Sequence, residues 1–170
     1  MNAVKFNKWL ISKDACSNGL AFAEGKSMQE TWDSLKRAGW MMWLYRQRNV
    51  NKKKCVMVAI YSAELCIKNF EDKYPNDKRP REAIESASKV LKNDTKKNRS
   101  AALSAASAAW SAALSAAWSA ESAAFSAESA ALSAASAWSA AWSAESAALK
   151  AGSAAQKQIC DYIRKIIKIK

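Results

Sequence analysis

The chain has 170 residues, half of them apolar, and its 27 Lys and Arg against 15 Asp and Glu give a formal net charge of +12. This charge favours anionic partners such as nucleotides, nucleic acid or acidic protein surfaces. The absence of His removes the most common general base and metal ligand, and the absence of a run of 18 apolar residues excludes a typical membrane-spanning helix.

The N-terminal region contains one short amphipathic segment, residues 5–11, with Phe6, Trp9 and Leu10 as its apolar positions. It has no apolar core of the kind found in signal peptides, so we expect a cytoplasmic protein with reduced thiols. No C-x-x-C pair is present, so we expect no metal and no cofactor. The chain's cysteines are Cys16, Cys55, Cys66 and Cys160.

The next region predicts two helical segments. Ser27 followed by Glu30 is a capping-box sequence, which predicts the start of a helix, and Gly39 predicts its end. A new apolar stretch begins at Trp40 and includes Trp43. These two indole rings either pack in the core or stack on a ligand.

Residues 54–70 carry apolar side chains at helical spacing and predict a further helix. A polar loop, residues 71–78, follows it. Pro80 suits the first turn of the next helix. The free N–H groups of that turn, flanked by Arg79 and Arg81, favour an anion. Residues 93–99 are polar and basic and predict a turn into the second half of the chain.

Residues 100–149 form a repeat of Ala and Ser in which Leu, Trp, Phe and Glu recur every three or four positions. This is the helical period, and Ala is the strongest helix former, so we expect a long helix or helix pair over residues 100–152. One unbroken helix would be about 75 Å long. Its stripe of large residues either packs on the rest of the protein or forms a binding surface. A flexible linker is disfavoured because linkers do not keep aromatic residues in phase.

The last segment, residues 153–170, predicts a basic amphipathic helix. Its apolar face includes Ile159 and Ile163, and we expect this face to dock on the core in preference to a membrane surface. Asp161 lies three residues before Arg164, which predicts a local ion pair.

Together these elements predict an all-α fold with a single domain over residues 1–170. About five N-terminal helices (residues 1–99) would pack on the repeat helix (100–152) and the C-terminal helix (153–170). Polar residues from distant segments could then meet in one ligand-binding site, with Trp40 and Trp43 stacking on the ligand. The polar candidates are Asp14, Arg79, Arg81, Glu85, Asp161 and Arg164.

Several short blocks resemble, in order, a family of small bacterial and phage immunity proteins. The blocks are Asp-Ala-Cys at 14–16, RAGWMMWL at 37–44, RPREAIE at 79–85 and, after an Ala-rich repeat, CDYIR at 160–164. Within the repeat, Ser and Trp stand where family members usually carry Tyr, Asp and Arg. The resemblance implies a binding or antagonist role in conflict between phage and bacterium, in the host cytoplasm if the chain is phage-encoded.

The leading functional prediction is a non-enzymatic antagonist that sequesters an anionic partner, most concretely a nucleotide immune signal. Arg would bind its phosphate and Trp would stack on its base. The alternatives are an immunity-type inhibitor that binds a toxin or defence protein and a nucleic-acid-binding protein. We expect a homo-oligomer formed through the Ala/Ser face, and no membrane partner. Bulky Trp residues argue against an ice-binding helix.

Overall fold

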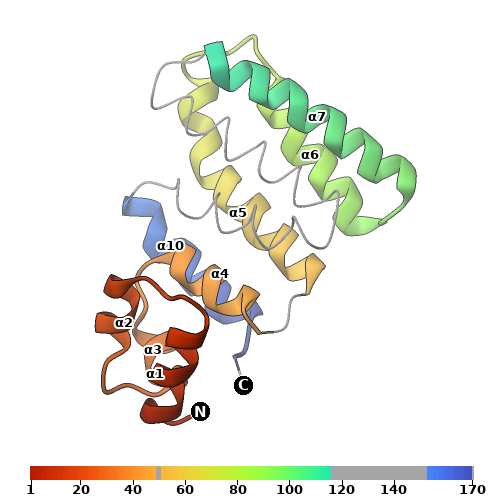
Figure 1. Ribbon diagram of the computed structural model, residues 1–170. Helices are drawn as coiled ribbons and strands as arrows, with labels where there is room; N and C mark the ends of the chain where they lie inside the picture. Colours follow the sequence, from red (N-terminus) through yellow and green to blue (C-terminus); the bar gives the residue numbers. More distant parts are fainter. Residues whose placement is uncertain (49–50, 116–152, 170) are drawn as a thin grey trace.

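The computed structural model describes residues 1–48, 51–115 and 153–169, and within these ranges it contains eight helices and no strand (Figure 1). The all-α prediction is therefore confirmed. Residues 116–152 lie outside the described residues, so the long repeat helix stays a prediction there. The helices are α1 (Ala3–Ser12), α2 (Ser17–Ala23), α3 (Met28–Ser34), α4 (Ala38–Arg46), α5 (Lys52–Glu71), α6 (Arg79–Lys92), α7 (Lys96–Ser115) and α10 (Ser153–Ile166).

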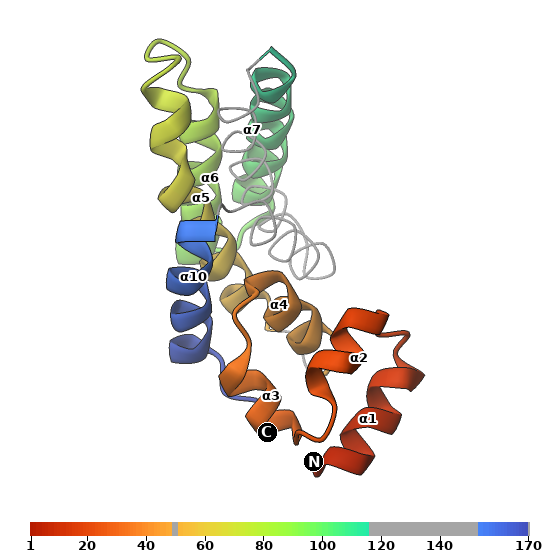
Figure 2. The ribbon, with the colours of Figure 1, turned by 90° about the vertical axis from the view of Figure 1, so that its left-hand side faces the viewer.

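Helices α1 to α4 lie at one end of the described molecule and the α6–α7 pair lies at the other (Figures 1 and 2). The long helix α5 extends between the two ends, and α10 packs against both α4 and α5. This arrangement places the last helix of the chain beside its N-terminal helices.

Helices α6 and α7 lie side by side, and small side chains are prominent among the buried residues of both. Ala83 and Ala87 of α6 and Ala102 and Ala106 of α7 are all buried, and methyl side chains let two helices approach closely. In contrast, Leu103 is 51% exposed. Of the two alternatives left open for the stripe of large residues, packing on the protein therefore does not apply at Leu103, because the neighbouring Ala residues are the buried ones.

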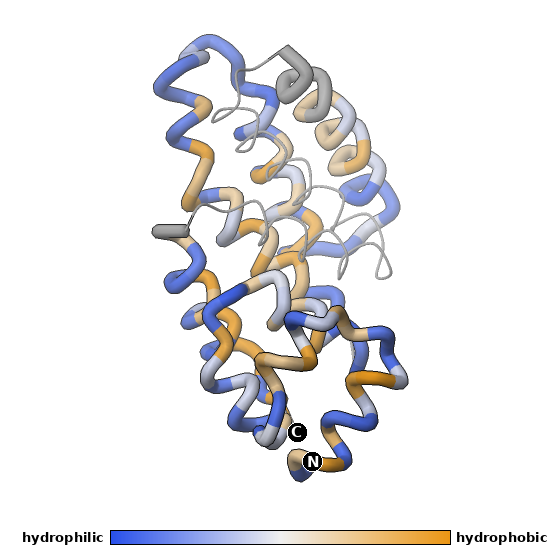
Figure 3. Tube along the Cα trace, turned by 60° about the vertical axis from the view of Figure 1, so that its left-hand side comes forward, coloured by the Kyte–Doolittle hydropathy of each residue, from blue (hydrophilic) through white to orange (hydrophobic). Residues whose placement is uncertain are grey.

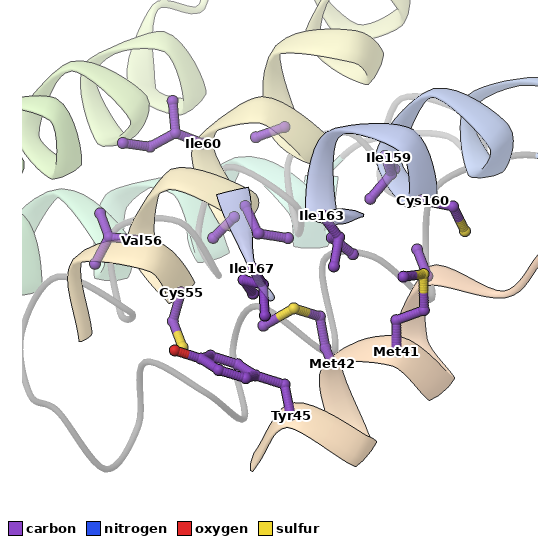
Figure 4. Packing of buried hydrophobic residues seen from close by; sticks show 14 of the residues in the cluster. Met41, Met42, Tyr45, Cys55, Val56, Ile60, Ile159, Cys160, Ile163 and Ile167 are labelled. Atoms are coloured by element: carbon purple, nitrogen blue, oxygen red, sulfur yellow. The ribbon is translucent and has the colours of Figure 1, made fainter. Parts of the chain in front are cut away.

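The main apolar core lies where α4, α5 and α10 meet (Figure 4). Met42 points toward Ile167, the residue after α10, and the Cys55 thiol lies beside the phenol of Tyr45. Ile163 is completely buried, which confirms that the apolar face of the last helix docks on the core. Burial raises the pKa of Cys55 to about 11, so this side chain remains a neutral thiol and packs as a small apolar group.

Sequence reasoning missed α2 and misplaced the boundary between α3 and α4. The capping box at Ser27 is confirmed, because the Glu30 N–H donates to Ser27 Oγ at 3.2 Å and the Ser27 N–H donates to the Glu30 carboxylate at 2.7 Å. However, α3 already ends at Ser34, and Gly39 lies in the first turn of α4 instead of ending a helix.

A contact from the far end of the chain explains this boundary. Gln156 Oε1 accepts the Ala38 N–H at 2.9 Å, at the start of α4. The Arg164 guanidinium donates to the carbonyl oxygens of Trp32 and Leu35, at the end of α3. Helix ends leave such groups without intrahelical partners. These two side chains of α10, Gln156 and Arg164, are here termed the α10 clamp. They satisfy backbone groups at the point where α3 ends and α4 begins.

Polar residues dominate the outer turns, and apolar residues concentrate where the helices pack (Figure 3). Asn93–Thr95 alone separate α6 from α7, so α7 begins at Lys96, inside the segment 93–99 that was expected to be a turn. Along the described ranges, no helix combines the length and apolarity needed to cross a bilayer.

Candidate functional site

A cavity of about 270 Å³ lies among the N-terminal helices. Its volume is close to the lower end of the range for small-molecule sites, and such sites typically combine apolar walls with a few polar groups. The lining follows this pattern, with aromatic and aliphatic side chains and three residues that carry a polar side chain. The lining residues are Phe6, Leu10, Asp14, Ala15, Cys16, Gly19, Phe22, Ala23, Thr31, Leu35, Trp40, Trp43 and Leu44.

Asp14 reaches the cavity through a specific turn after α1. The Ala15 N–H donates to the Leu10 carbonyl and the Asp14 N–H donates to the Ile11 carbonyl, both at 3.1 Å. This is the Schellman arrangement, which places its turn residue in the left-handed region usually occupied by Gly. Asp14 adopts it with φ of 54°. The turn therefore puts an exposed carboxylate, in place of a glycine, at the edge of the cavity.

Two basic side chains lie over aromatic rings that line the cavity. The Lys26 Nζ lies 4.3 Å from the centroid of the Phe22 ring, and the Arg37 guanidinium carbon lies 4.8 Å from that of Trp40. The Phe22 and Trp40 rings contact each other edge to face, with centroids 5.9 Å apart. Cations above aromatic faces are attracted by the ring electrons. Two positive charges are thereby held against rings that line the cavity.

Trp40 and Trp43 are both half-buried and both line the cavity. Their indoles therefore do not pack wholly into the core. Because they follow each other on one face of α4, the helix presents two adjacent flat surfaces to the same space. Asp14, Trp40 and Trp43, three of the sequence-predicted site residues, are thus brought together around one cavity.

Cys16 is the exposed cysteine among the described residues, and its side chain lines the same cavity. Cys55, Cys66 and Cys160 are buried and free. Within the described ranges no cluster of Cys, Asp and Glu could hold a metal ion. Because Cys16 is exposed and lines the cavity, a molecule bound there would shield its thiol from reagents. The rate of its reaction with a thiol reagent can therefore report whether the cavity is occupied.

Arg79, Arg81 and Glu85 lie elsewhere, in α6, whose start is at the end of the molecule opposite to α1–α3 (Figures 1 and 2). The Arg81 Nε and Nη2 donate to the two Glu71 carboxylate oxygens, each at 2.7 Å. Arg79 makes a similar fork with Asp77, at 2.9 and 2.6 Å. These hydrogen bonds lower the pKa of both carboxylates. The two guanidiniums are thus engaged with neighbouring carboxylates.

Asp161 and Arg164 form the predicted local ion pair, with 3.2 Å between Asp161 Oδ1 and Arg164 Nη1. The same guanidinium belongs to the α10 clamp and holds the carbonyl of Leu35, a cavity-lining residue. The six polar candidates therefore occupy three separate places and do not form one site. Ligand binding by Arg79, Arg81, Glu85, Asp161 or Arg164 stays a prediction.

Sequence reasoning missed Thr31, Phe22, Lys26 and Arg37 as parts of this region. Phe22 lies on α2, a helix that was not predicted, and Thr31 was not singled out in the sequence. Arg37 was within a recognised block but is exposed and adjacent to Trp40 in space. Arg37 is the N-cap residue of α4, and its closeness in sequence to Trp40 was the available signal.

No protein-family profile, curated protein sequence or solved structure matches this chain. The likeness to immunity proteins therefore remains an expectation from the sequence blocks.

Proposed function

We propose that the chain is a non-catalytic protein that binds a small aromatic anion in the cavity between its N-terminal helices. The observation that carries this proposal is the lining, which combines two adjacent indoles with cations held over neighbouring rings. A planar ring gains contact area and stacking energy against such surfaces. No turnover is proposed, because the chain contains no His to act as a general base.

A nucleotide is the most concrete ligand of this class. Its base would stack on Trp40 or Trp43, and its phosphate would face Arg37. The Asp14 carboxylate repels a phosphate but accepts hydrogen bonds, so amino groups of the base would face that side. The net charge of +12 adds a general attraction for anions.

The biological role that we propose is sequestration of a nucleotide immune signal by a bacterial or phage antagonist. This part rests on the sequence blocks that resemble immunity proteins. A protein that only binds and holds a signal needs no reactive group beyond the binding cavity, and the proposed site meets that requirement.

A second candidate function is binding to a protein partner through α1. Val4 and Ile11 are 68% and 57% exposed, and their spacing of seven places them on one face of the helix. Exposed apolar residues of this kind can form part of an interface. An immunity-type inhibitor that contacts a toxin or defence protein would use this face.

Calorimetric titration of the full chain with AMP, GMP, CMP and UMP tests the proposed function. At least one nucleotide should bind, and it should slow the reaction of Cys16 with a thiol reagent. Arg37→Ala should weaken its affinity about 10- to 100-fold, the range for losing a hydrogen bond to a charged group. Lys36→Ala is the matched control, because it removes an exposed charge from the adjacent residue.

Absence of binding by all four nucleotides would reject the nucleotide as ligand. If Arg37→Ala and Lys36→Ala weaken nucleotide affinity equally, only the net charge of the protein contributes to binding. Copurification of a host protein that is lost in a Val4→Ser and Ile11→Ser double variant would support the second candidate. The expected homo-oligomer is tested separately, since light scattering that gives only the 18.6 kDa monomer would contradict it.

A further inference from the structure

The start of α5 lies beside the turn between α6 and α7 (Figure 1), and basic residues concentrate in both. Asp94 of that turn joins the two regions, because its carboxylate lies 2.9 Å from Lys52 Nζ and 2.7 Å from Arg99 Nη1. Five further lysines around this junction are exposed and form no ion pair among the described residues. These lysines, here termed the basic end, are Lys53, Lys89, Lys92, Lys96 and Lys97.

Short connections bring the lysines of three helices together. Residues 72–78 join α5 to α6, and Asn93–Thr95 join α6 to α7, so successive helices pack side by side in opposite directions. The starts of α5 and α7 therefore lie at the same end of this three-helix unit as the last turn of α6. The basic end is a single surface, although its residues span more than forty positions of the chain.

Helix stability does not account for these charges. The first turns of α5 and α7 begin with runs of Lys and contain no acidic residue. The start of a helix is the positive end of its dipole, where acidic side chains stabilise and basic side chains destabilise. The lysines at the starts of α5 and α7 therefore oppose the dipoles of their own helices and repel one another. Charges that act against the local structure are typical of a functional surface.

We infer that the basic end binds the phosphate backbone of double-stranded nucleic acid. Interfaces with nucleic acid are strongly basic and polar, and Lys and Asn side chains are among the common phosphate contacts. Asn51 and Asn93 are exposed beside the lysines and add such polar groups. The inference is independent of the nucleotide cavity, which lies among the helices at the other end of the described molecule.

The composition of the basic end favours a duplex over other polyanions. Residues 51–54 and 89–99 contain no exposed large apolar side chain, whereas protein interfaces have an apolar centre and membrane-bound helices insert an apolar face. The same segments contain no aromatic residue on which an unpaired base could stack. The phosphates of a duplex require only positive charge and hydrogen-bond donors, which this surface supplies.

Fluorescence anisotropy of the full chain with a labelled DNA duplex of mixed sequence tests the inference. The affinity should fall roughly 500-fold between 50 and 200 mM salt, as expected for about five phosphate contacts. In a triple variant, Lys92→Gln with Lys96→Gln and Lys97→Gln, the slope of log affinity against log salt should decrease by about 3. Lys53→Gln, on a different helix, should decrease it by about 1.

The matched control is a second triple variant, Lys5→Gln with Lys8→Gln and Lys13→Gln. It removes the same charge from exposed positions in and beside α1, at the other end of the described molecule. Salt screens charges beyond about 10 Å at 0.1 M ionic strength, so the slope should stay close to that of the wild type. Circular dichroism should show both triple variants folded, because all six positions are exposed.

A duplex of RNA is the second probe, since phosphates are common to both nucleic acids. Binding of either duplex supports the inference, and the tighter one identifies the nucleic acid. Absence of binding by both duplexes at 50 mM salt would overturn it, as would equal slopes in the two triple variants. Tighter binding of single-stranded DNA, or equally strong competition by poly-glutamate of the same charge, would replace the duplex with another partner. Failure of nucleotides to enter the cavity would reject the proposed function and leave this inference standing.

Discussion

The guanidinium of Arg164 donates to the backbone carbonyl of Leu35, 129 positions earlier in the chain. Leu35 is the C-cap residue of α3 and lines the cavity, while Arg164 lies on α10. A cation at the carboxyl end of a helix satisfies carbonyls that have no intrahelical partner and interacts favourably with the helix dipole. This contact therefore supports the wall of the proposed site without reaching into it.

Replacing Arg164 with Ala should lower the free energy of unfolding by about 1.5–3 kcal/mol, the range for hydrogen bonds to a charged group. Urea denaturation followed by Trp fluorescence measures the effect. Lys157→Ala is the matched control, because Lys157 is 90% exposed and also faces Asp161, at 3.9 Å. Equal effects from the two variants would mean that the carbonyl contacts of Arg164 add nothing.

Replacing Gln156 with Ala should destabilise the protein by about 0.5–2 kcal/mol, because the buried Ala38 N–H loses its acceptor. Gln156→Glu keeps an acceptor and adds a negative charge at the start of α4, so it should recover most of the loss. Gln158→Ala, an exposed position on the same helix, serves as the control in denaturation experiments. A similar loss from Gln158→Ala would contradict the capping role.

The backbone at Asp14 predicts an order of stabilities among variants. Because φ is 54° there, Gly fits without strain, whereas a Cβ in this region costs about 1–2 kcal/mol. Asp14→Gly should therefore unfold at a higher denaturant concentration than Asp14→Ala. Both variants remove the carboxylate, so their nucleotide affinities should change equally. The reverse order of stabilities would show that the turn is not held in the left-handed region.

The fork between Arg81 and Glu71 predicts a pH-dependent contribution to stability. Hydrogen bonds from Arg81 lower the pKa of Glu71 below its ordinary value of 4.5. A carboxylate with a lowered folded-state pKa stabilises the protein above its unfolded pKa, and this contribution is lost as the pH falls through the folded pKa. Glu71→Gln should therefore cost about 0.5–1 kcal/mol at pH 7, because the pair is partly exposed.

At pH 3 the difference between Glu71→Gln and the wild type should be smaller than at pH 7. Urea denaturation at both pH values and at intermediate points measures this. Asp72→Asn removes an exposed charge from the next residue and is the control. A difference that stays constant with pH would show that the pair contributes through packing and not through charge.

Much of the fold could be predicted from the sequence, because the patterns that specify these helices are local. Helical spacing in residues 54–70 predicted α5 (Lys52–Glu71), and the pair Ser27 and Glu30 predicted the start of α3. The end of α3 could not be predicted, since it depends on hydrogen bonds from α10. Likewise the exposure of Leu103 depends on which face of α7 meets α6, and the repeat alone does not specify that face.

The candidate site could be predicted only in part, for the same reason. Trp40 and Trp43 stood out as aromatic residues on one helical face, and Asp14 was part of a recognised block. Arg79 and Arg81 stood out by charge, but their carboxylate partners Glu71 and Asp77 lie in or beside a loop whose geometry the sequence did not reveal.

The α10 clamp also sets an order of events during synthesis. The residues that line the cavity all lie between positions 6 and 44, and the acceptor for Ala38 and the donor for Leu35 are made more than a hundred residues later. At typical elongation rates this delay is roughly 6–25 s. During that interval the ends of α3 and α4 must be satisfied by water. The hydrogen bonds that hold the end of α3 and the start of α4 beside the cavity therefore form only after α10 has been synthesised.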